Sequence, residues 1–325
     1  MIVAELDART ASRVRLSASP AAETVAWLRL AVSGRRDSLV GRAGLTGQLT
    51  RDDDVRLLAT LVHAGRRGYL PDFLTPKPGV SDVLETQLAQ VSATSADEVR
   101  HQVLTETFAD GPAPATVVRA VEDGAFARRA ARGLESLWRH AVCDVWGAFG
   151  HLVEADIARL STLQGRAGVT AMLDTLHPHV TYDGACLQVW MPPWEEAGVL
   201  RNTELVVSPA LLDLPRVSPQ LCRPGQAVLR FPVRTIGDPS PTVRRRSLGK
   251  LIGETRVGLL YDLVTPRCTA SLSERHRLSA ATVSYHLQIL HDCGLVTRVR
   301  RGNVVDYQRS RRAETLLRGP EVTVT

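Results

Sequence analysis

The sequence is poor in lysine and cysteine and contains no long apolar run. Among its 40 basic residues only Lys77 and Lys250 are lysine, which indicates mainly a GC-rich coding bias and also suits phosphate binding. The five cysteines are scattered and form no CxxC pair, a pattern typical of free thiols in a reducing cytoplasm. No apolar run approaches the roughly 18 residues of a transmembrane helix. The acidic start, residues 1–7, lacks the apolar stretch of a signal peptide, so we expect a cytoplasmic protein.

Motifs of common catalytic sites are also missing. The sequence has no GxSxG, no phosphate-binding glycine loop and no HExxH. His101, His140 and His151 fall on expected helices with arginines nearby, where surface or core positions are commoner than catalytic bases. We therefore expect no enzyme and no cofactor, and an enzyme fused to a further domain of another function is a distant alternative.

Positive charge is concentrated at the C-terminal end. The chain has 325 residues, of which 44% are hydrophobic, enough for two domains with cores of their own. Residues 243–325 hold 15 basic and 7 acidic side chains, a net charge of +8, whereas residues 1–242 have a net charge of −2. A basic module on a near-neutral body indicates nucleic-acid binding by one domain. A solvated basic tail is the other interpretation.

Residues 279–293 predict a capped amphipathic helix. Ser279 is an N-cap candidate, because its hydroxyl can accept a free amide of the first turn. Val283, Leu287 and Leu290 follow at spacings of four and three, which predicts one buried stripe. Gly294 stands where a left-handed residue would end the helix.

A basic hairpin is expected directly after this helix. Segments 295–300 and 304–309 alternate between apolar and polar residues, and Arg301-Gly302-Asn303 joins them as the tip. A helix, a stop and a basic hairpin are typical of the recognition helix and wing of a winged helix-turn-helix.

The rest of the sequence predicts a mainly α chain of the α+β class. Helical periodicity dominates residues 20–176, with interruptions expected near Gly133 and at 147–150 and a new helix from Gly168. Residues 180–189 predict a hairpin, and 204–207 and 227–233 predict further strands of a small antiparallel sheet.

Residues 237–242, Gly-Asp-Pro-Ser-Pro-Thr, form the most linker-like stretch. We therefore predict a helix-rich domain over 1–242 for dimerisation and effector binding, a winged helix over 243–319 and a tail over 320–325. A helix over 247–264 would open the second domain. The candidates for a dimer interface on it are Leu248, Leu251 and Leu259.

The order and spacing of these C-terminal elements resemble the ArsR/SmtB family of winged-helix repressors. The likeness covers residues 248–317 and rests on Gly253-Glu-Thr-Arg-Val-Gly-Leu-Leu, Leu278-Ser-Ala-Ala-Thr-Val-Ser-Tyr-His-Leu and Gly294-Leu-Val. The long N-terminal region is similar to that of long-form members of the family. The resemblance implies a homodimer that represses from a two-fold operator and is released or retained by an effector.

The resemblance also implies which residues meet double-stranded DNA. The base-reading candidates, all outside the buried stripe and small or hydrogen-bonding, are Ala280, Thr282, Ser284, Tyr285 and His286. The wing candidates for phosphates or the minor groove are Arg298, Arg300, Arg301 and Asn303. Members often hold glutamine at the position of Ala280, so specificity is expected to rest more on Tyr285, His286 and DNA shape. Alternatively, His286 packs under the wing, Tyr285 belongs to a core or dimer contact, and the arginines are only solvated.

Metal sensing, well known for the family, is not favoured here. The expected positioning helix has no cysteine pair, only Cys268 before it, and the last helix offers Glu314 alone. Asp174, His177 and His179 supply too few converging ligands. We predict no metal site, and a metal-sensing repressor is an alternative.

The effector is expected to be an organic molecule that binds the N-terminal body. Trp190 and Trp194 are candidates for the wall of an apolar pocket, because ligand sites are mainly apolar. An ordinary core is the other interpretation of these tryptophans. A body that recruits a protein partner instead of an effector is the alternative function.

Overall fold

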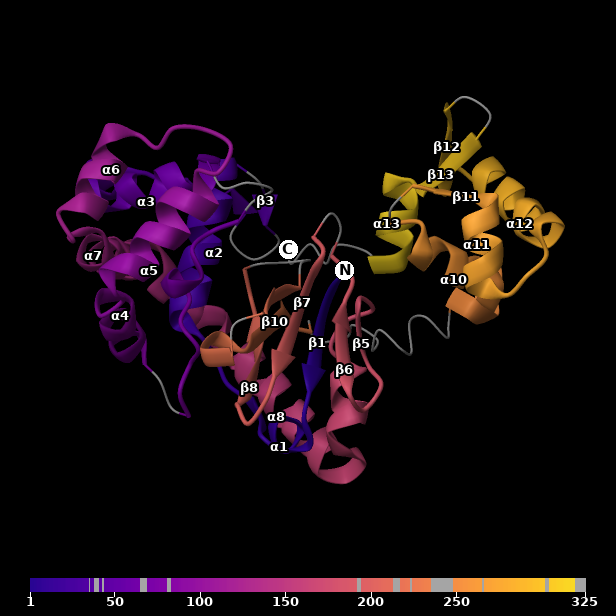
Figure 1. Cartoon of the computed structure of the whole chain (residues 1–325), viewed down its shortest axis with the longest axis horizontal. Coiled ribbons are helices and arrows are strands. Elements are labelled where there is room, and N and C mark those ends of the chain that lie inside the picture. Colours follow the sequence, from indigo (N-terminus) through magenta and orange to yellow (C-terminus); the bar gives the residue numbers. More distant parts are fainter. Residues whose placement is uncertain are drawn as a thin grey trace. The chain divides into compact units, whose positions relative to one another are not determined.

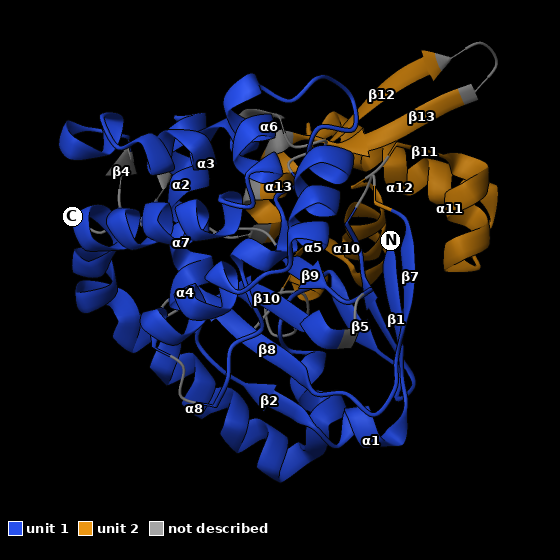
Figure 2. Ribbon diagram, turned by 60° about the vertical axis from the view of Figure 1, so that its left-hand side comes forward, with its two compact units in different colours: residues 1–191, 195–236 blue, residues 192–194, 237–325 orange. Residues whose placement is uncertain are grey.

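The computed structural model divides the chain into two compact units (Figure 2). Unit 1 comprises residues 1–191 and 195–236, and unit 2 comprises 192–194 and 237–325. The structure describes residues 1–34, 36–37, 41–42, 44–64, 69–80, 83–191, 194–212, 217–222, 224–234, 248–264, 266–301 and 304–318. The expected linker 237–242 and tail 320–325 lie outside the described residues, so the domain boundary stays a prediction.

Unit 1 is rich in helices (Figure 1). In chain order they are α1 (Ala8–Ala11), α2 (Pro20–Ser33), α3 (Asp53–Ala64), α4 (Leu84–Ser92), α5 (Ala96–Arg100), α6 (Ala115–Glu122), α7 (Phe126–Leu137) and α8 (Cys143–Leu173). Two π-helical segments, His101–Thr107 and Trp138–Val142, continue α5 and α7. Short 3-10 turns lie at Gly47–Thr50, Asp72–Leu74 and Pro224–Gln226.

Local signals set both ends of α2. The Oγ atom of Ser19 accepts the N–H of Ala22 at 3.3 Å, and Pro20 occupies the first turn, where its missing N–H costs nothing. Gly34 follows the helix in the left-handed conformation, with φ +62. The helix predicted from residue 20 is therefore confirmed.

Glycines interrupt the helices at other places than predicted. Gly133 lies inside α7 and Gly147 inside α8, so neither ends a helix. A Cβ on Gly133 would lie 2.8 Å from the carbonyl oxygen of Asp54, so this glycine allows α7 to approach α3 closely. The chain turns instead at Gly124, with φ +61. The helix start predicted at Gly168 coincides with a break inside α8, where φ is +83.

Strands of unit 1 form two four-stranded sheets, of order β5–β6–β1–β7 and β2–β8–β10–β9. A separate pair is formed by β3 (Arg36–Asp37) and β4 (Gly41–Arg42). The remaining bounds are β1 (Ile2–Leu6), β2 (Val14–Leu16), β5 (Val180–Tyr182), β6 (Cys186–Val189), β7 (Glu196–Leu200), β8 (Leu205–Ala210), β9 (Ser218–Gln220) and β10 (Val228–Pro232).

The α+β class is confirmed, but the sheets are mixed rather than antiparallel. Strand β1 pairs in parallel with β7, and β8 pairs in parallel with both β2 and β10. The predicted hairpin is confirmed as β5–β6, with Gly184 in its turn at φ +100. Parallel pairs join segments far apart in the chain, such as Ile2 and Glu196, and no local turn signal announces them.

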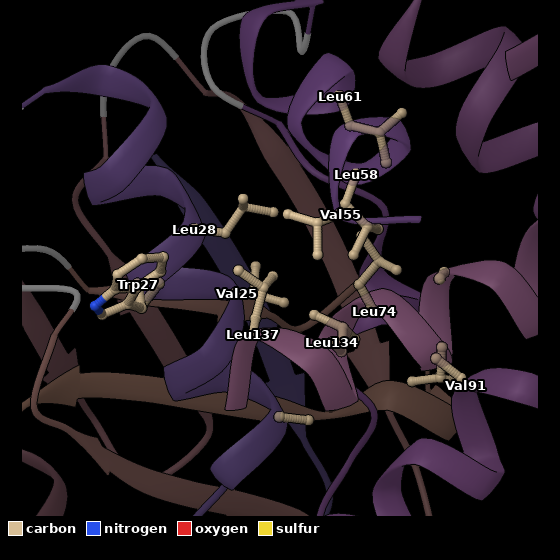
Figure 3. Packing of buried hydrophobic residues seen from close by; sticks show 14 of the residues in the cluster. Val25, Trp27, Leu28, Val55, Leu58, Leu61, Leu74, Val91, Leu134 and Leu137 are labelled. Atoms are coloured by element: carbon tan, nitrogen blue, oxygen red, sulfur yellow. The ribbon is translucent and has the colours of Figure 1, made fainter. Parts of the chain in front are cut away.

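Helices α2, α3, α4 and α7 enclose the main hydrophobic core of unit 1. Buried side chains of these helices and of the turn at Asp72–Leu74 gather between them. Figure 3 shows Val25, Trp27, Leu28, Val55, Leu58, Leu61, Leu74, Val91, Leu134 and Leu137 of this cluster. Helix α8 contacts strands of both sheets, β5 in one and β2 and β8 in the other. The long helix thus ties the two sheets together.

Unit 2 has the order of elements expected of a winged helix (Figure 1). Its helices are α10 (Glu254–Asp262), α11 (Thr269–His276), α12 (Ala280–Asp292) and α13 (Arg311–Arg318). Its strands are β11 (Arg267–Cys268), β12 (Val296–Arg301) and β13 (Val304–Arg309), which form an antiparallel sheet of order β11–β13–β12. The two-residue strand β11 was not predicted, because it is too short to show an alternating pattern.

The helix predicted over 247–264 is broken. Residues 248–252 are helical, and Gly253 then takes φ +91 and ψ 136 before α10 begins. This backbone conformation is accessible to glycine and strained for other residues. Leu248 and Leu259 are buried in the core of unit 2, so these two interface candidates are already covered by their own module. Leu251 is 75% exposed and remains a candidate.

Candidate nucleic-acid interface

Helix α12 begins at the predicted cap. The Oγ atom of Ser279 accepts the backbone N–H of Thr282 at 3.1 Å, and the two hydroxyls lie 2.8 Å apart. A cap of this kind satisfies one of the amides that the first turn leaves without a helical partner. The first turn of the helix, which enters the groove in helix-turn-helix proteins, is thereby fixed.

The end of α12 is fixed by a Schellman motif. Gly294 takes φ +68, its N–H donates to the carbonyl of His291 at 2.8 Å, and the N–H of Leu295 donates to the carbonyl of Leu290 at 2.8 Å. The Oγ of Ser310 donates to the carbonyl of Gly294 at 2.7 Å. The start of α13 and the first strand of the wing are thus tied to the end of α12.

One face of α12 holds the module together and the opposite face is open to solvent. Val283, Leu287 and Leu290 are buried, as their spacing predicted. Among the predicted base-reading residues, Ala280, Ser284 and Tyr285 are exposed, and Tyr285 is 62% exposed although it is a large aromatic side chain. Tyr285 therefore does not belong to the core of unit 2.

Two further residues belong to the solvent face. Ala281 and Gln288 are exposed and, at 100° per residue, lie beside Ser284 and Tyr285 on the helix. We define the outward face of α12 as Ala280, Ala281, Ser284, Tyr285 and Gln288. The spacing of Gln288, four after Ser284 and three after Tyr285, was a signal in the sequence that the prediction did not use. Its amide nitrogen donates to Asp292 at 2.7 Å.

Thr282 and His286 lie at the edge of the outward face and are half-buried. Burial and the positive charge of Arg256 lower the pKa of His286 below its usual value, which favours the neutral imidazole. Its Nδ1 is shielded from solvent and has no hydrogen-bond partner among the described residues. His286 is therefore partly engaged in packing against its own module.

The wing is a regular antiparallel hairpin of β12 and β13. Arg298 lies opposite Tyr307 and Arg300 opposite Val305, so the two arginines share one face of the hairpin. Both are exposed. Asn303 and the side chain of Arg301 lie outside the described residues.

The positioning helix α11 is fastened to α10 by one carboxylate. Asp262 accepts hydrogen bonds from the guanidinium of Arg275 at 3.2 Å, and its Oδ2 lies 2.7 Å from Nε2 of His276. Burial favours the protonated acid, but the hydrogen bonds and charges of Arg275 and His276 outweigh it and lower the pKa of Asp262. Arg277 then turns the chain into α12 with φ +52.

Helix, turn and wing thus form one framework that presents a polar outward face beside exposed arginines. No described helix is long and apolar enough to cross a membrane. Within the described ranges, no group of three or more His, Cys, Asp or Glu side chains is placed to hold a metal ion. Trp190 and Trp194 line neither the cavity beside Phe73 and Lys77 nor the one beside Trp27 and His140, and their role stays a prediction.

Comparison with known families identifies the C-terminal module. The family model described as "Bacterial regulatory protein, arsR family" matches residues 253–298, from the break before α10 into β12. No curated protein and no solved structure matched the chain. The matched segment contains α11, α12 and the Schellman motif, and unit 1 lies outside it. Residues 253–298 are therefore an ArsR-like helix-turn-helix, and this likeness supports DNA binding and transcription regulation by the C-terminal module.

Proposed function

We propose that the chain is a sequence-specific repressor that acts as a cytoplasmic homodimer on a two-fold operator and has no catalytic activity. The observation that carries the proposal is the outward face of α12. Its side chains are small or capable of hydrogen bonding, they are exposed, and the module has a net charge of +8 over residues 243–325. Such side chains suit base edges in the major groove.

The wing supplies the second contact of the proposal. Arginines bind phosphates or enter a narrow minor groove, and they contribute affinity that depends little on sequence. Arg298 and Arg300 are exposed on one face of β12, which places two positive charges side by side. Helix α12 would then read sequence while the wing holds the backbone.

The proposal is tested by an experiment that separates sequence reading by α12 from backbone binding by the wing. Operator sequences are first selected from random DNA with the full chain, and affinities for operator and random DNA are then measured across a salt series. Arg298→Ala should weaken binding to both DNAs and lower the salt slope by ~1, as expected for one lost phosphate contact. Ser284→Ala should reduce discrimination between the two DNAs by roughly 1–3 kcal/mol if its hydroxyl reads a base.

A matched control is offered by Arg128, an exposed arginine on α7 of unit 1. Arg128→Ala should leave affinity and salt slope unchanged. If Ser284→Ala and Arg298→Ala each weaken binding to operator and random DNA equally, α12 does not read bases in the groove. Ser284 is a cleaner test than His286, because the half-buried imidazole also contributes to packing.

A further inference from the structure

Unit 1 contains a cavity of about 470 Å³ at the junction of three separate chain segments. The segments are the turn at Asp72–Leu74 with the residues after it, the connection between α4 and α5, and the turn at Pro224–Gln226. A volume of this size falls in the range of small-molecule sites, which is about 300–1,000 Å³. None of these segments belongs to the DNA-binding module.

The cavity carries one positive and one negative side chain that do not pair with each other. Lys77 lines it, and its Nζ donates to the carbonyl of Glu204 at 3.0 Å and lies 4.0 Å from the Glu204 carboxylate. Glu204 already forms an ion pair with Arg15 at 2.9 Å. Two cations thus share one carboxylate, so Glu204 does not neutralise both Arg15 and Lys77.

Glu98 is the negative side chain of the cavity. One of its oxygens accepts the amide N–H of Gln102 at 3.0 Å, and the side chain is half-buried. Gln102 is fully buried and accepts the backbone N–H of Phe73 at 3.1 Å, so it connects two walls of the cavity. Glu98 is therefore held in place while its second oxygen is left for a ligand.

Gln226 adds a second acceptor. Its Oε1 is buried and has no hydrogen-bond partner among the described residues. A buried acceptor without a donor is unfavourable, and a ligand that supplies the donor removes this cost. Phe73, Pro76 and Ala93 add apolar or small surface to the lining, next to which a hydrocarbon group can lie.

We propose that this cavity binds a small zwitterion of the amino-acid class, with the ligand carboxylate at Lys77 and its ammonium group at Glu98 and Gln226. Opposite charges at fixed places select a ligand with two charged ends over a plain acid or a plain amine. Burial lowers the pKa of Lys77, and a bound carboxylate would favour the charged ammonium form. The inference deepens the proposed function, because it gives the effector of the regulator a site and a chemical class.

The test is a calorimetric titration of the full chain without DNA. Each standard L-amino acid is added singly, and any that bind are compared with the matching deaminated acid and decarboxylated amine. We expect at least one amino acid to bind with a Kd of ~1 mM or tighter. Each analogue should bind at least about tenfold more weakly than the amino acid, because it lacks one charge-assisted contact. The inference is overturned if no amino acid binds or if either analogue binds as well as the zwitterion.

Substitutions in the cavity lining test whether the ligand binds there. Lys77→Met and Glu98→Gln should each weaken binding about tenfold or more. Lys250→Met, at the only other lysine, and Glu85→Gln, at an exposed acid of α4, should not. Glu98→Gln keeps an oxygen for Gln102, so it carries the test if Lys77→Met does not fold. Unchanged affinity in either folded cavity variant overturns the inference. Because DNA is absent, the result is independent of the proposed operator binding.

Discussion

Two serines of unit 2, Ser279 and Ser284, differ in the contacts of their hydroxyls. The hydroxyl of Ser279 caps α12, whereas that of Ser284 points from the outward face and has no partner among the described residues. The same chemical change, serine to alanine, therefore separates stability from recognition. One position holds the helix, and the other is proposed to read DNA.

For Ser279→Ala we expect a loss of ~1 kcal/mol in the free energy of unfolding of unit 2, the usual cost of a missing N-cap. Amide hydrogen exchange of α12, measured on the full chain, checks it. Ser284→Ala is the matched control and should leave exchange nearly unchanged while it reduces operator discrimination. Faster exchange in both variants to the same extent would show that the cap is not what stabilises the first turn.

Asp262 gives unit 2 a dependence on pH with a definite sign. Its pKa is lowered in the folded state, so the carboxylate stabilises the fold above the unfolded value of about 3.9, and this stabilisation is lost as the pH falls through the folded pKa. Asp262→Asn should cost about 1 kcal/mol at pH 7, where the partly exposed Arg275 limits the effect. Urea unfolding of both proteins from pH 7 to pH 3 measures this difference.

The gap between wild type and Asp262→Asn should narrow toward the acid end of the series, because protonation of Asp262 begins to remove the charge that the asparagine lacks. Asp292→Asn is the control, since Asp292 is 63% exposed, and it should change little at any pH. A constant gap across the series would mean that packing, and not the charge, accounts for the loss.

Among the elements, the crossing of α3 and α7 depends on a residue without a side chain. An added Cβ at Gly133 would lie 2.8 Å from the Asp54 carbonyl oxygen and 2.9 Å from Cδ1 of Leu58. Gly133→Ala should therefore force the helices apart and cost about 1–3 kcal/mol, as overpacking does. Urea unfolding followed by tryptophan fluorescence reports on this, because Trp27 belongs to the same core.

Gly147 of α8 is the matched control, because an added Cβ there meets no atom within 4 Å. Gly147→Ala should stabilise the chain by about 0.5–1 kcal/mol, since alanine loses less backbone entropy in a helix. If both substitutions stabilise the chain, then α3 and α7 do not pack as closely as the structure shows.

At the scale of the whole molecule, the regulator is expected to be a dimer. A single winged helix touches too little DNA for tight specific binding, and a two-fold dimer would meet half-sites about one helical turn, ~34–36 Å, apart. Sedimentation at micromolar concentration, with and without operator, measures this. A monomer under both conditions contradicts the prediction. Leu251→Glu should weaken the dimer if this exposed leucine lies in the interface.

Most of unit 2 could be predicted from the sequence, because its signals are local. The cap at Ser279, the stripe from Val283 to Leu290 and the left-handed Gly294 lie within sixteen residues of one another. Each acts through backbone groups or side chains one or two turns away. The break at Gly253 was not predicted, because glycine is also tolerated inside helices. Only the packing of Leu248 and Leu259 in the core of unit 2 decides between a continuous and a broken helix.

In unit 1, strand pairing and the position of the cavity depend on the tertiary structure. Its helices followed from periodicity and caps, but β1 finds its partners at residues 186–189 and 196–200, and a parallel pair leaves no turn in the sequence between its strands. The cavity has the same origin, since Lys77, Glu98 and Gln226 lie on three segments that only the fold brings together. The sequence alone therefore determined the kind of DNA-binding module, and long-range packing determined where a ligand can bind.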